Sequence, residues 1–460
     1  MDRESKELGA RAAGYSLGRA AVSTVLLSAY SWLIMHVART QIAPHFAYQG
    51  YTDRDWVSAE VIRAIVMTVL LGLLLSKRSE RVGMFALLFL AATVAVPLLW
   101  VPVFYGPLNG AGLLQLHLLT TVCFGVLFGF VILPTNPIRI LRLPDSIFQS
   151  IILISVAAIL AVLVIFYGLR PALFSLDEVY DQRDSYNQNI GTLGRYMVGA
   201  LTNALLPVLL VWGYAKRRVG VIALAILSFA LTYAMTGFKS IIVGALLTVV
   251  AMFVTRKWPN VPQNWLMALG GAVLLGYLAD RVWSTFVFSS YLTRRAITTS
   301  GINTAYYIDL FSRVEFYRLR HSFLQFLGDP PHGVPPARLV GEVYYGSESM
   351  AANANFIADG FANFGPIGAL GTSAVAGLCL WIYGRLTCHL PVSVAVPATI
   401  FILVAWANTS VFTTLLTHGG LLLALLMAIM PEPRSADCAG SELHQQPEIA
   451  GKVPPGEIRG

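Results

Sequence analysis

Residues 346–366 read Gly-Ser-Glu-Ser-Met-Ala-Ala-Asn-Ala-Asn-Phe-Ile-Ala-Asp-Gly-Phe-Ala-Asn-Phe-Gly-Pro, and the chain after them is mainly apolar as far as residue 384. A long polar stretch thus leads directly into a run of the length that crosses a lipid bilayer. If a helix begins near Asn353, then Asn355, Asp359 and Asn363 recur every four residues and share one face. Such a face is typical of a helix turned toward protein or water rather than lipid.

This polar face has two interpretations. In the first it forms a site, because an acid among amides offers donors and acceptors suited to sugar hydroxyls. In the second the amides bind neighbouring helices, or satisfy backbone groups freed by a helix break at Gly360, Gly365 and Pro366. The sequence leaves both interpretations open.

Apolar runs of membrane-spanning length recur along the whole chain. Of the 460 residues, 56% are hydrophobic and only 12% are charged, whereas a soluble domain carries about 25% charged residues. Barrel strands would give short alternating segments instead of runs of about twenty residues. The composition therefore predicts an all-α, polytopic integral membrane protein.

We expect about twelve spans in one membrane domain, residues 1–430. They are predicted at residues 20–37, 58–76, 82–103, 112–133, 147–168, 197–215, 219–236, 239–255, 264–283, 356–384, 389–408 and 411–430. Residues 431–460 are rich in proline, glycine and charge and lack an apolar face. They are predicted to form a disordered cytoplasmic tail.

Basic residues set the expected orientation of the chain. Lysines and arginines precede the first span and recur at every second junction, as in Lys216-Arg217-Arg218. The positive-inside rule then places both termini in the cytoplasm and the long loops 38–57, 169–196 and 284–355 outside. The net charge of +8 is thus a topology signal rather than the footprint of a nucleic-acid partner. Any chemistry is expected on the outer face.

No metal site is expected. Asp53-Arg54-Asp55 matches a D-x-D pattern that can hold a divalent ion. Thr52 followed by Asp55 also forms a capping box for the next helix, and this interpretation is favoured. The four cysteines show neither metal-ligand spacing nor a disulfide framework.

Arginines gather in the last outer segment, where the positive-inside rule does not expect cations. There are seven between residues 281 and 338: Arg281, Arg294, Arg295, Arg313, Arg318, Arg320 and Arg338. An anionic substrate is the simplest reason for them, although pairing with acids or lipid headgroups accounts for some. The clearest such pair by spacing is Glu315 with Arg318.

The same segment contains a predicted surface helix. Residues 303–327 carry apolar side chains at helical spacing and end at Gly328-Asp329-Pro330-Pro331. This pattern predicts an amphipathic helix lying along the membrane surface.

Two further cations are candidate ligands of an anion. Lys239 follows Gly237 at a tight turn, where a helix start exposes free N–H groups, although the lysine could simply snorkel to the interface. Arg183 lies in the second outer loop between Tyr180 and Tyr186, which offer flat faces for sugar rings. A solvated loop is the simpler explanation for any single residue there.

The chain resembles the Wzy-type oligosaccharide repeat-unit polymerases, which include the O-antigen and exopolysaccharide polymerases of bacterial inner membranes. The resemblance rests on Thr236-Gly-Phe-Lys-Ser240, the arginine-bearing outer segment, and Asn355-Phe-Ile-Ala-Asp-Gly-Phe-Ala-Asn-Phe-Gly365. It covers the layout of about twelve spans and implies a glycosyltransferase-C-like fold. The implied reaction transfers a growing glycan from undecaprenyl pyrophosphate to a fresh lipid-linked repeat unit at the periplasmic side. A chain-length regulator and a flippase are the implied partners, and the related O-antigen ligases share the architecture.

The resemblance implies an inverting glycosyl transfer that needs neither metal nor cofactor. Because lipid pyrophosphate is already a good leaving group, the enzyme must stabilise its departing charge and deprotonate an acceptor hydroxyl. The expected base is Asp359, His321 or Glu348; Asp359 is favoured by position and His321 by the chemistry of histidine near neutral pH. The residues expected to bind substrate are Arg183, Lys239, Arg281, Arg313, Arg318, Arg320, Asn355 and Asn363.

A transporter or flippase for lipid-linked sugars is the competing hypothesis. It would use the same arginines to bind without reacting. Such folds often contain inverted repeats, and the sequence shows no such symmetry. The long segment at 284–355 lies asymmetrically in the chain, which favours an active site at the outer face.

Overall fold

A computed structural model of the protein describes residues 2–76, 82–138, 140–168, 191–259, 261–322 and 324–432. Every regular element within these residues is helical. Nine segments of this described part are long and apolar enough to cross a membrane: Gly18–Gln49, Val82–Phe104, Gly110–Val131, Asp145–Phe166, Thr192–Ala215, Val219–Thr236, Lys239–Lys257, Asn264–Val282 and Phe356–Leu386. The prediction of an all-α multi-pass membrane protein is confirmed at this level.

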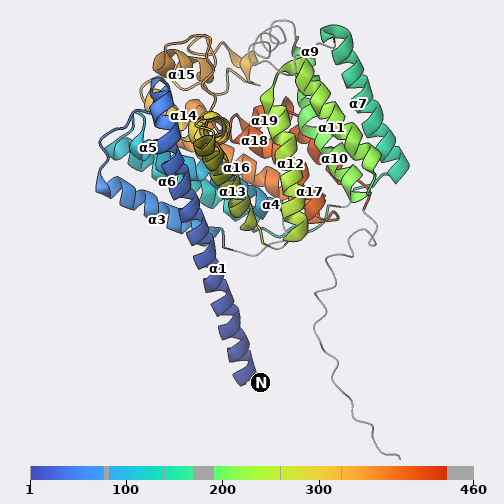
Figure 1. Ribbon diagram of the computed structural model, residues 1–460, viewed down its shortest axis with the longest axis horizontal. Helices are drawn as coiled ribbons and strands as arrows, with labels where there is room; N and C mark the ends of the chain where they lie inside the picture. The colour runs from blue at the N-terminus through green and yellow to red at the C-terminus, as the bar shows by residue number, and fades with distance from the viewer. Residues whose placement is uncertain are drawn as a thin grey trace, which may run out of the picture.

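The helices form a bundle from which the first turns of α1 project alone (Figure 1). In chain order the elements are α1 (Asp2–Val37), η1 (Ala38–Ile42), α2 (Ala43–Phe46), η2 (Ala47–Gln49), α3 (Ser58–Leu74), α4 (Val82–Leu90), η3 (Ala91–Ala95), α5 (Val96–Phe104), α6 (Gly110–Val131), α7 (Asp145–Tyr167), α9 (Thr192–Ala200), η4 (Leu201–Leu205), α10 (Leu206–Ala215), α11 (Val219–Thr236), α12 (Lys239–Lys257), α13 (Asn264–Val282), η5 (Ser289–Thr298), α14 (Thr299–Phe311), η6 (Gln325–Leu327), α15 (Pro336–Tyr345), α16 (Phe356–Leu386), α17 (Val392–Ala398), α18 (Ile400–Trp406), α19 (Val411–Leu416) and α20 (Gly420–Ile429). The end of the bundle that carries α15 lies opposite the projecting start of α1.

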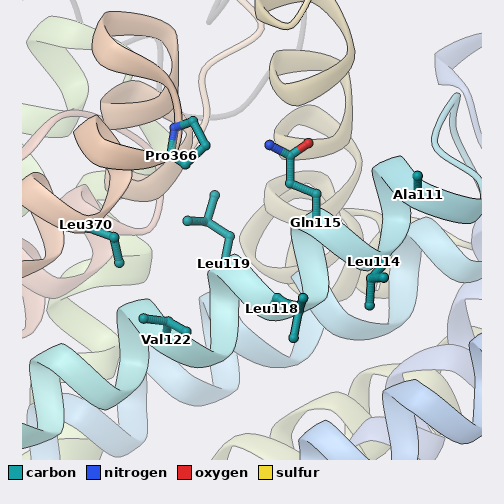
Figure 2. A pocket seen from close by; sticks show the side chains of 8 residues that line it. All are labelled: Ala111, Leu114, Gln115, Leu118, Leu119, Val122, Pro366 and Leu370. Carbon is teal, nitrogen blue, oxygen red and sulfur yellow. The ribbon is translucent and has the colours of Figure 1, made fainter.

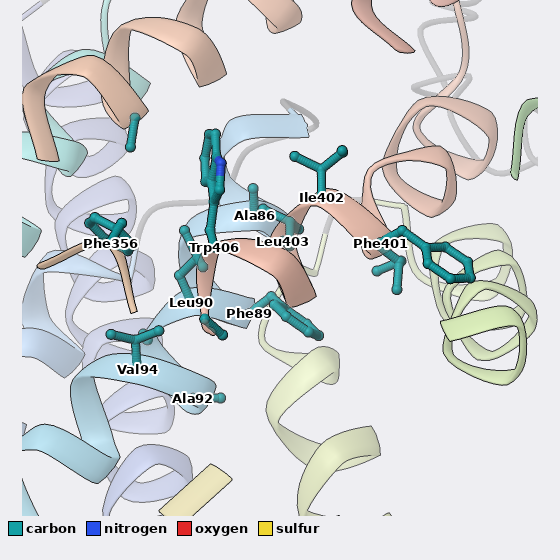
Figure 3. Packing of buried hydrophobic residues seen from close by; sticks show 14 of the residues in the cluster. Ala86, Phe89, Leu90, Ala92, Val94, Phe356, Phe401, Ile402, Leu403 and Trp406 are labelled. Carbon is teal, nitrogen blue, oxygen red and sulfur yellow. The ribbon is translucent and has the colours of Figure 1, made fainter. Parts of the chain in front are cut away.

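The span made of α4, η3 and α5 lies at the centre of the bundle. Every residue from Val82 to Leu99 is buried, because α6, α14, α16 and the C-terminal helices pack around it. Figure 3 shows Phe89, Leu90 and Val94 of this span beside Phe356 and the aromatic ring of Trp406. Close packing of such apolar side chains holds helices together in the absence of water.

Three expected spans are shorter or interrupted. The segment predicted at 58–76 is the 17-residue helix α3, and those predicted at 389–408 and 411–430 are divided into α17, α18, α19 and α20. Pro397 lies inside α17 and lacks the N–H that would continue the helix ladder. Gly419 adopts φ 81° between α19 and α20, a conformation that glycine accepts readily. The described residues thus contain fewer uninterrupted spans than the twelve expected.

The predicted surface helix at 303–327 is wrong. The chain there forms α14, which ends at Phe311, followed by turns and the single turn η6. All residues of α14 from Ser300 to Ile308 are buried, and the helix packs against α5 and α16. Gly301 permits this approach, since a Cβ there would lie 2.4 Å from the Pro97 carbonyl oxygen. Part of the expected outer loop 284–355 therefore lies inside the bundle.

The predicted capping box at Thr52 and Asp55 is also wrong. α3 begins only at Ser58 and has no side-chain cap. Arg54 instead forms an ion pair with Glu60 and donates from Nε to the Val103 carbonyl at 2.8 Å. Glu60 in turn accepts from the backbone N–H of Gly110 at 3.1 Å. This ion pair joins the segment before α3 to the start of α6.

Candidate functional site

Asn355 begins α16 as its N-cap. Its Oδ1 accepts from the backbone N–H groups of Ile357 and Ala358 at 3.0 and 3.2 Å. Its Nδ2 donates to Ser300 Oγ and Thr304 Oγ1 of α14 at 2.9 and 2.8 Å. Asn355 is fully buried. The protein itself thus uses this amide to start one helix and bind another, and the substrate contact of Asn355 stays a prediction.

α16 is broken two turns after its start. Phe364 and Gly365 leave the helical conformation, and Gly365 has φ 60° and ψ −147°. The ring of Phe316 lies so close that a Cβ on Gly365 would be 3.0 Å from it. Pro366 follows, which lacks the N–H that the break would otherwise free. A break in this region was one of the two interpretations of the sequence.

The break is where residues 317–319 attach. Tyr317 and Arg318 donate their backbone N–H groups to the carbonyls of Ala362 and Asn363 at 3.0 and 3.2 Å. The Asn363 side chain accepts from the N–H of Leu319 at 2.7 Å and donates to the Asp359 carbonyl at 2.8 Å. Asn363 is buried and both ends of its amide are bound within the protein, so its substrate contact stays a prediction as well.

These contacts bring His321 beside Asp359. His321 Nε2 lies 3.7 Å from Asp359 Oδ1, and the two side chains are 13% and 14% exposed. The ring of Tyr317 meets the imidazole edge-on at a centroid distance of 5.1 Å. Two candidate bases that lie 38 residues apart in the sequence thus form one pair.

The pair has unused hydrogen-bonding capacity. His321 Nδ1, Asp359 Oδ2 and the Nε of neighbouring Arg320 are buried and have no hydrogen-bond partner. Burial, and secondarily the nearby Asp359 carboxylate, raise the pKa of the Tyr307 phenol well above its ordinary value. Buried polar groups normally find partners, so this cluster of unsatisfied ones is a candidate place for a ligand to complete the bonding.

The arginines near this pair differ in their availability. Arg320 forms an ion pair with Glu315 at 3.0 Å, so the pairing of Glu315 with Arg318 expected from spacing is wrong. Arg318 is exposed and has φ 52°. Arg313 binds Asp309, and its Nη2 lies 3.2 Å from the phenol of Tyr344.

The other predicted site residues do not join the His321–Asp359 pair. Glu348 and Arg281 are exposed, and no hydrogen bond or ion pair within the described residues links either to it. Lys239 begins α12 after Gly237, as expected, and donates to the phenol of Tyr291 at 2.9 Å. Arg183 lies outside the described residues.

An open apolar groove of about 410 Å³ lies between α6 and α16. Figure 2 shows Leu118, Leu119 and Val122 on α6 and Pro366 and Leu370 on α16. Gln115 is the polar residue among those that line it. Because Pro366 directly follows the break, the groove starts next to the segment that positions His321.

Sequence reasoning missed a buried arginine. It treated Arg294 as one of seven similar cations, but Arg294 is only 9% exposed and binds Gln49, which lies in the loop expected at 38–57. Tyrosines surround it, including Tyr51 and Tyr345. The pairs of adjacent tyrosines at 306–307 and 344–345 were the available signal.

No cluster of three or more potential metal-binding histidines, cysteines or acids occurs in the part of the chain that the structure describes. Comparisons of the chain with protein-family models, with curated proteins and with solved structures find no match. The site geometry is accordingly the basis for assigning a function to this multi-pass membrane protein.

Proposed function

We propose that the protein is a bacterial inner-membrane polymerase that joins undecaprenyl-pyrophosphate-linked oligosaccharide repeat units at the periplasmic face. The observation that carries this proposal is the His321–Asp359 pair, whose Nε2 and Oδ1 atoms are 3.7 Å apart. The other two polar atoms of the pair, His321 Nδ1 and Asp359 Oδ2, have no hydrogen-bond partner. A base next to cations is what glycosyl transfer from a lipid pyrophosphate requires. The resemblance to Wzy-type polymerases supports the same assignment.

His321 acts as the general base in this proposal. An acceptor hydroxyl loses its proton to His321 while its oxygen attacks the anomeric carbon of the donor sugar. Asp359 stabilises the imidazolium that forms. The bond from the anomeric carbon to pyrophosphate breaks, and the electron pair leaves with the pyrophosphate. Attack from the opposite side inverts the anomeric configuration.

Arg320 and Arg318 stabilise the departing pyrophosphate. Arg320 has an unpartnered buried Nε in addition to its bond with Glu315. Arg318 is exposed next to it in the turn held by Asn363. Guanidinium groups match the geometry of phosphate oxygens and keep their charge at all relevant pH values.

The groove between α6 and α16 takes the hydrocarbon chain of the lipid carrier. Its lining is apolar except for Gln115, and it starts at Pro366, beside the break to which residues 317–319 attach. A chain lying there keeps its pyrophosphate at the level of Arg318 and Arg320, outside the apolar region.

Transport of the same lipid-linked sugars is the second candidate. The observation that favours it is the interruption of α16 and of the segments that form α17 to α20. Transporters build binding sites from such discontinuous helices near the middle of the membrane. This candidate makes the His321–Asp359 pair a binding group rather than a base. A ligase would share the chemistry proposed above and differ in its acceptor.

Reconstitution tests the proposal. Purified protein in liposomes is supplied with the lipid-pyrophosphate-linked repeat unit of its own host, and the products are resolved on a gel. We expect a ladder spaced by one repeat unit, lost in His321→Ala and Asp359→Asn.

The matched control is His36→Phe, because His36 pairs with Tyr277 on α13 and has no contact with the site. It should retain the ladder. A single transfer to a different acceptor would indicate a ligase. Movement of unaltered lipid-linked sugar across the membrane, without any ladder, would replace the polymerase by a transporter.

A further inference from the structure

Arg294 is a buried cation without an acidic partner. It lies in η5, is 9% exposed, and forms no ion pair with a carboxylate among the described residues. Its Nε and Nη2 donate to Ser290 Oγ at 3.3 and 3.1 Å, and its Nη1 donates to Gln49 Oε1 at 2.5 Å. The ring of Phe46 covers the guanidinium at 4.0 Å from its centroid. Arginine has five N–H donors, so two remain after these three bonds.

A charge in this environment is unfavourable unless an anion compensates it. Burial lowers the pKa of Arg294, but a guanidinium remains protonated in proteins. Ser290 and Gln49 provide neutral acceptors only. The site therefore keeps an uncompensated positive charge and two N–H donors, which together attract a small oxyanion.

Aromatic and hydroxyl groups adjoin this charge. Gln49, which binds Arg294, also donates to the phenol of Tyr48 at 3.2 Å, and Tyr48 is 73% exposed. Tyr51 and Tyr345 also lie near Arg294. An exposed aromatic face beside a guanidinium suits a sugar ring that carries a negative charge.

This cluster lies away from the reacting atoms. Arg294 is 13 residues before Tyr307, the α14 residue whose pKa is raised in part by the Asp359 carboxylate. At 1.5 Å per residue, the intervening helix extends roughly 20 Å. A group bound at Arg294 therefore belongs to a sugar of the oligosaccharide other than the one that reacts.

We propose that Arg294, Gln49 and Tyr48 form a subsite for a carboxylate-bearing sugar, a uronic acid in chemical class, within the repeat unit. This inference rests on the proposed function for the identity of its substrate. Binding at the subsite can be measured without any transfer reaction, so the two proposals can fail separately.

The experiment measures binding of sodium glucuronate to the full-length protein in nanodiscs, by the shift in thermal unfolding midpoint. Glucose and sodium phosphate are compared at matched ionic strength. We expect glucuronate to bind and glucose not to bind. Arg294→Gln should weaken glucuronate binding by about 10- to 100-fold, the effect of losing a charge-assisted hydrogen bond.

Three further variants isolate the subsite. Arg256→Gln removes one exposed positive charge at the end of α12 and should leave glucuronate binding unchanged. His321→Ala should also leave it unchanged. Tyr48→Ala changes an exposed side chain, so it should fold even if Arg294→Gln does not, and it should weaken binding.

Equal responses to glucuronate and glucose, or undiminished binding in both Arg294→Gln and Tyr48→Ala, would overturn the inference. Binding of phosphate as tight as that of glucuronate would assign the subsite to phosphate and overturn the sugar-acid assignment. Glucuronate binding without a polymer ladder would retain the subsite and reject the polymerase. A ladder without glucuronate binding would retain the polymerase and reject the subsite.

Discussion

In the part of the chain that the structure describes, two largely buried pairs of a basic and an acidic side chain are built differently. In the Arg54–Glu60 pair, Arg54 also binds the Val103 carbonyl and Glu60 also binds the Gly110 N–H. In the His321–Asp359 pair the two groups are 3.7 Å apart, and His321 Nδ1 and Asp359 Oδ2 have no partner. One pair is completed by the protein, and the other is not.

The difference separates structure from candidate chemistry. A buried polar group without a partner costs about 1–3 kcal/mol, so unsatisfied groups persist where something else completes them. The Arg54–Glu60 pair connects helices. The His321–Asp359 pair is left incomplete, and in the proposed function a substrate completes it. Five single-residue variants break or sharpen this comparison.

The largest effect is expected from His321→Ala and Asp359→Asn. Loss of a general base should lower the single-turnover rate of glycan transfer by about 10²- to 10⁴-fold. The thermal unfolding midpoint should change little, because neither group has a strong hydrogen bond in the unliganded protein. A large fall in the midpoint, with normal turnover per folded molecule, would make this pair structural.

Glu60→Gln tests the completed pair. Removing one partner of a buried ion pair leaves the other charge unpaired, so the free energy of unfolding should fall by about 3 kcal/mol. Unfolding in mixed micelles measures it, and turnover per folded molecule should be unchanged. The double variant Arg54→Met with Glu60→Leu serves as the control and should lose less stability. A stable but inactive Glu60→Gln would contradict the structural role.

Asn363→Ala removes the acceptor that holds the N–H of Leu319. We expect a fall in kcat of about 10- to 100-fold with little change in KM, because His321 is displaced while substrate binding remains. Steady-state kinetics at several lipid-linked substrate concentrations separates the two parameters. An unchanged kcat would mean that residues 317–319 are held in place without this amide.

Arg318→Gly has the smallest expected effect on stability. Arg318 has φ 52°, a conformation that costs a residue with a Cβ about 1 kcal/mol. Glycine should therefore raise the free energy of unfolding by up to about 1 kcal/mol, while transfer slows because a pyrophosphate-binding cation is lost. Denaturant titration measures the expected gain in stability, and the transfer assay on the same sample measures the expected loss of rate. Higher stability with full activity would remove Arg318 from the site.

Part of the candidate site could be predicted from the spacing of polar residues in the sequence. The four-residue spacing of Asn355, Asp359 and Asn363 correctly predicted a helix in this region, but the helix begins at Phe356 and Asn355 is its N-cap. It did not predict that the Asn355 amide would bind α14 or that the Asn363 amide would accept a hydrogen bond from Leu319. Both partners come from distant parts of the chain, which spacing does not reveal.

The segment at 303–327 shows why the rest was not predictable. Its apolar residues at helical spacing matched a surface helix, yet Asn303 and Thr304 are also buried, because they bind Asn353 and Asn355. The chain then turns at Arg318 and Leu319 in left-handed conformations. The expected helix already ends at Phe311, so Glu315 lies in irregular chain and meets Arg320 instead of Arg318. The same turn unites His321 and Asp359, which sequence reasoning had treated as alternatives.

The enclosure of the central span has a consequence for biogenesis. Val82–Phe104 contacts protein along its whole length in the finished molecule, but it is synthesised before α6, α14 and α16, which cover it. Before those helices are made, the span has only the earlier helices such as α1 and α3, and lipid, to pack against. Its surface is apolar except for Thr93 and suits both environments. We infer that the helices that cover it insert after it and displace lipid from around it. The centre of the bundle is then the last part from which lipid is displaced.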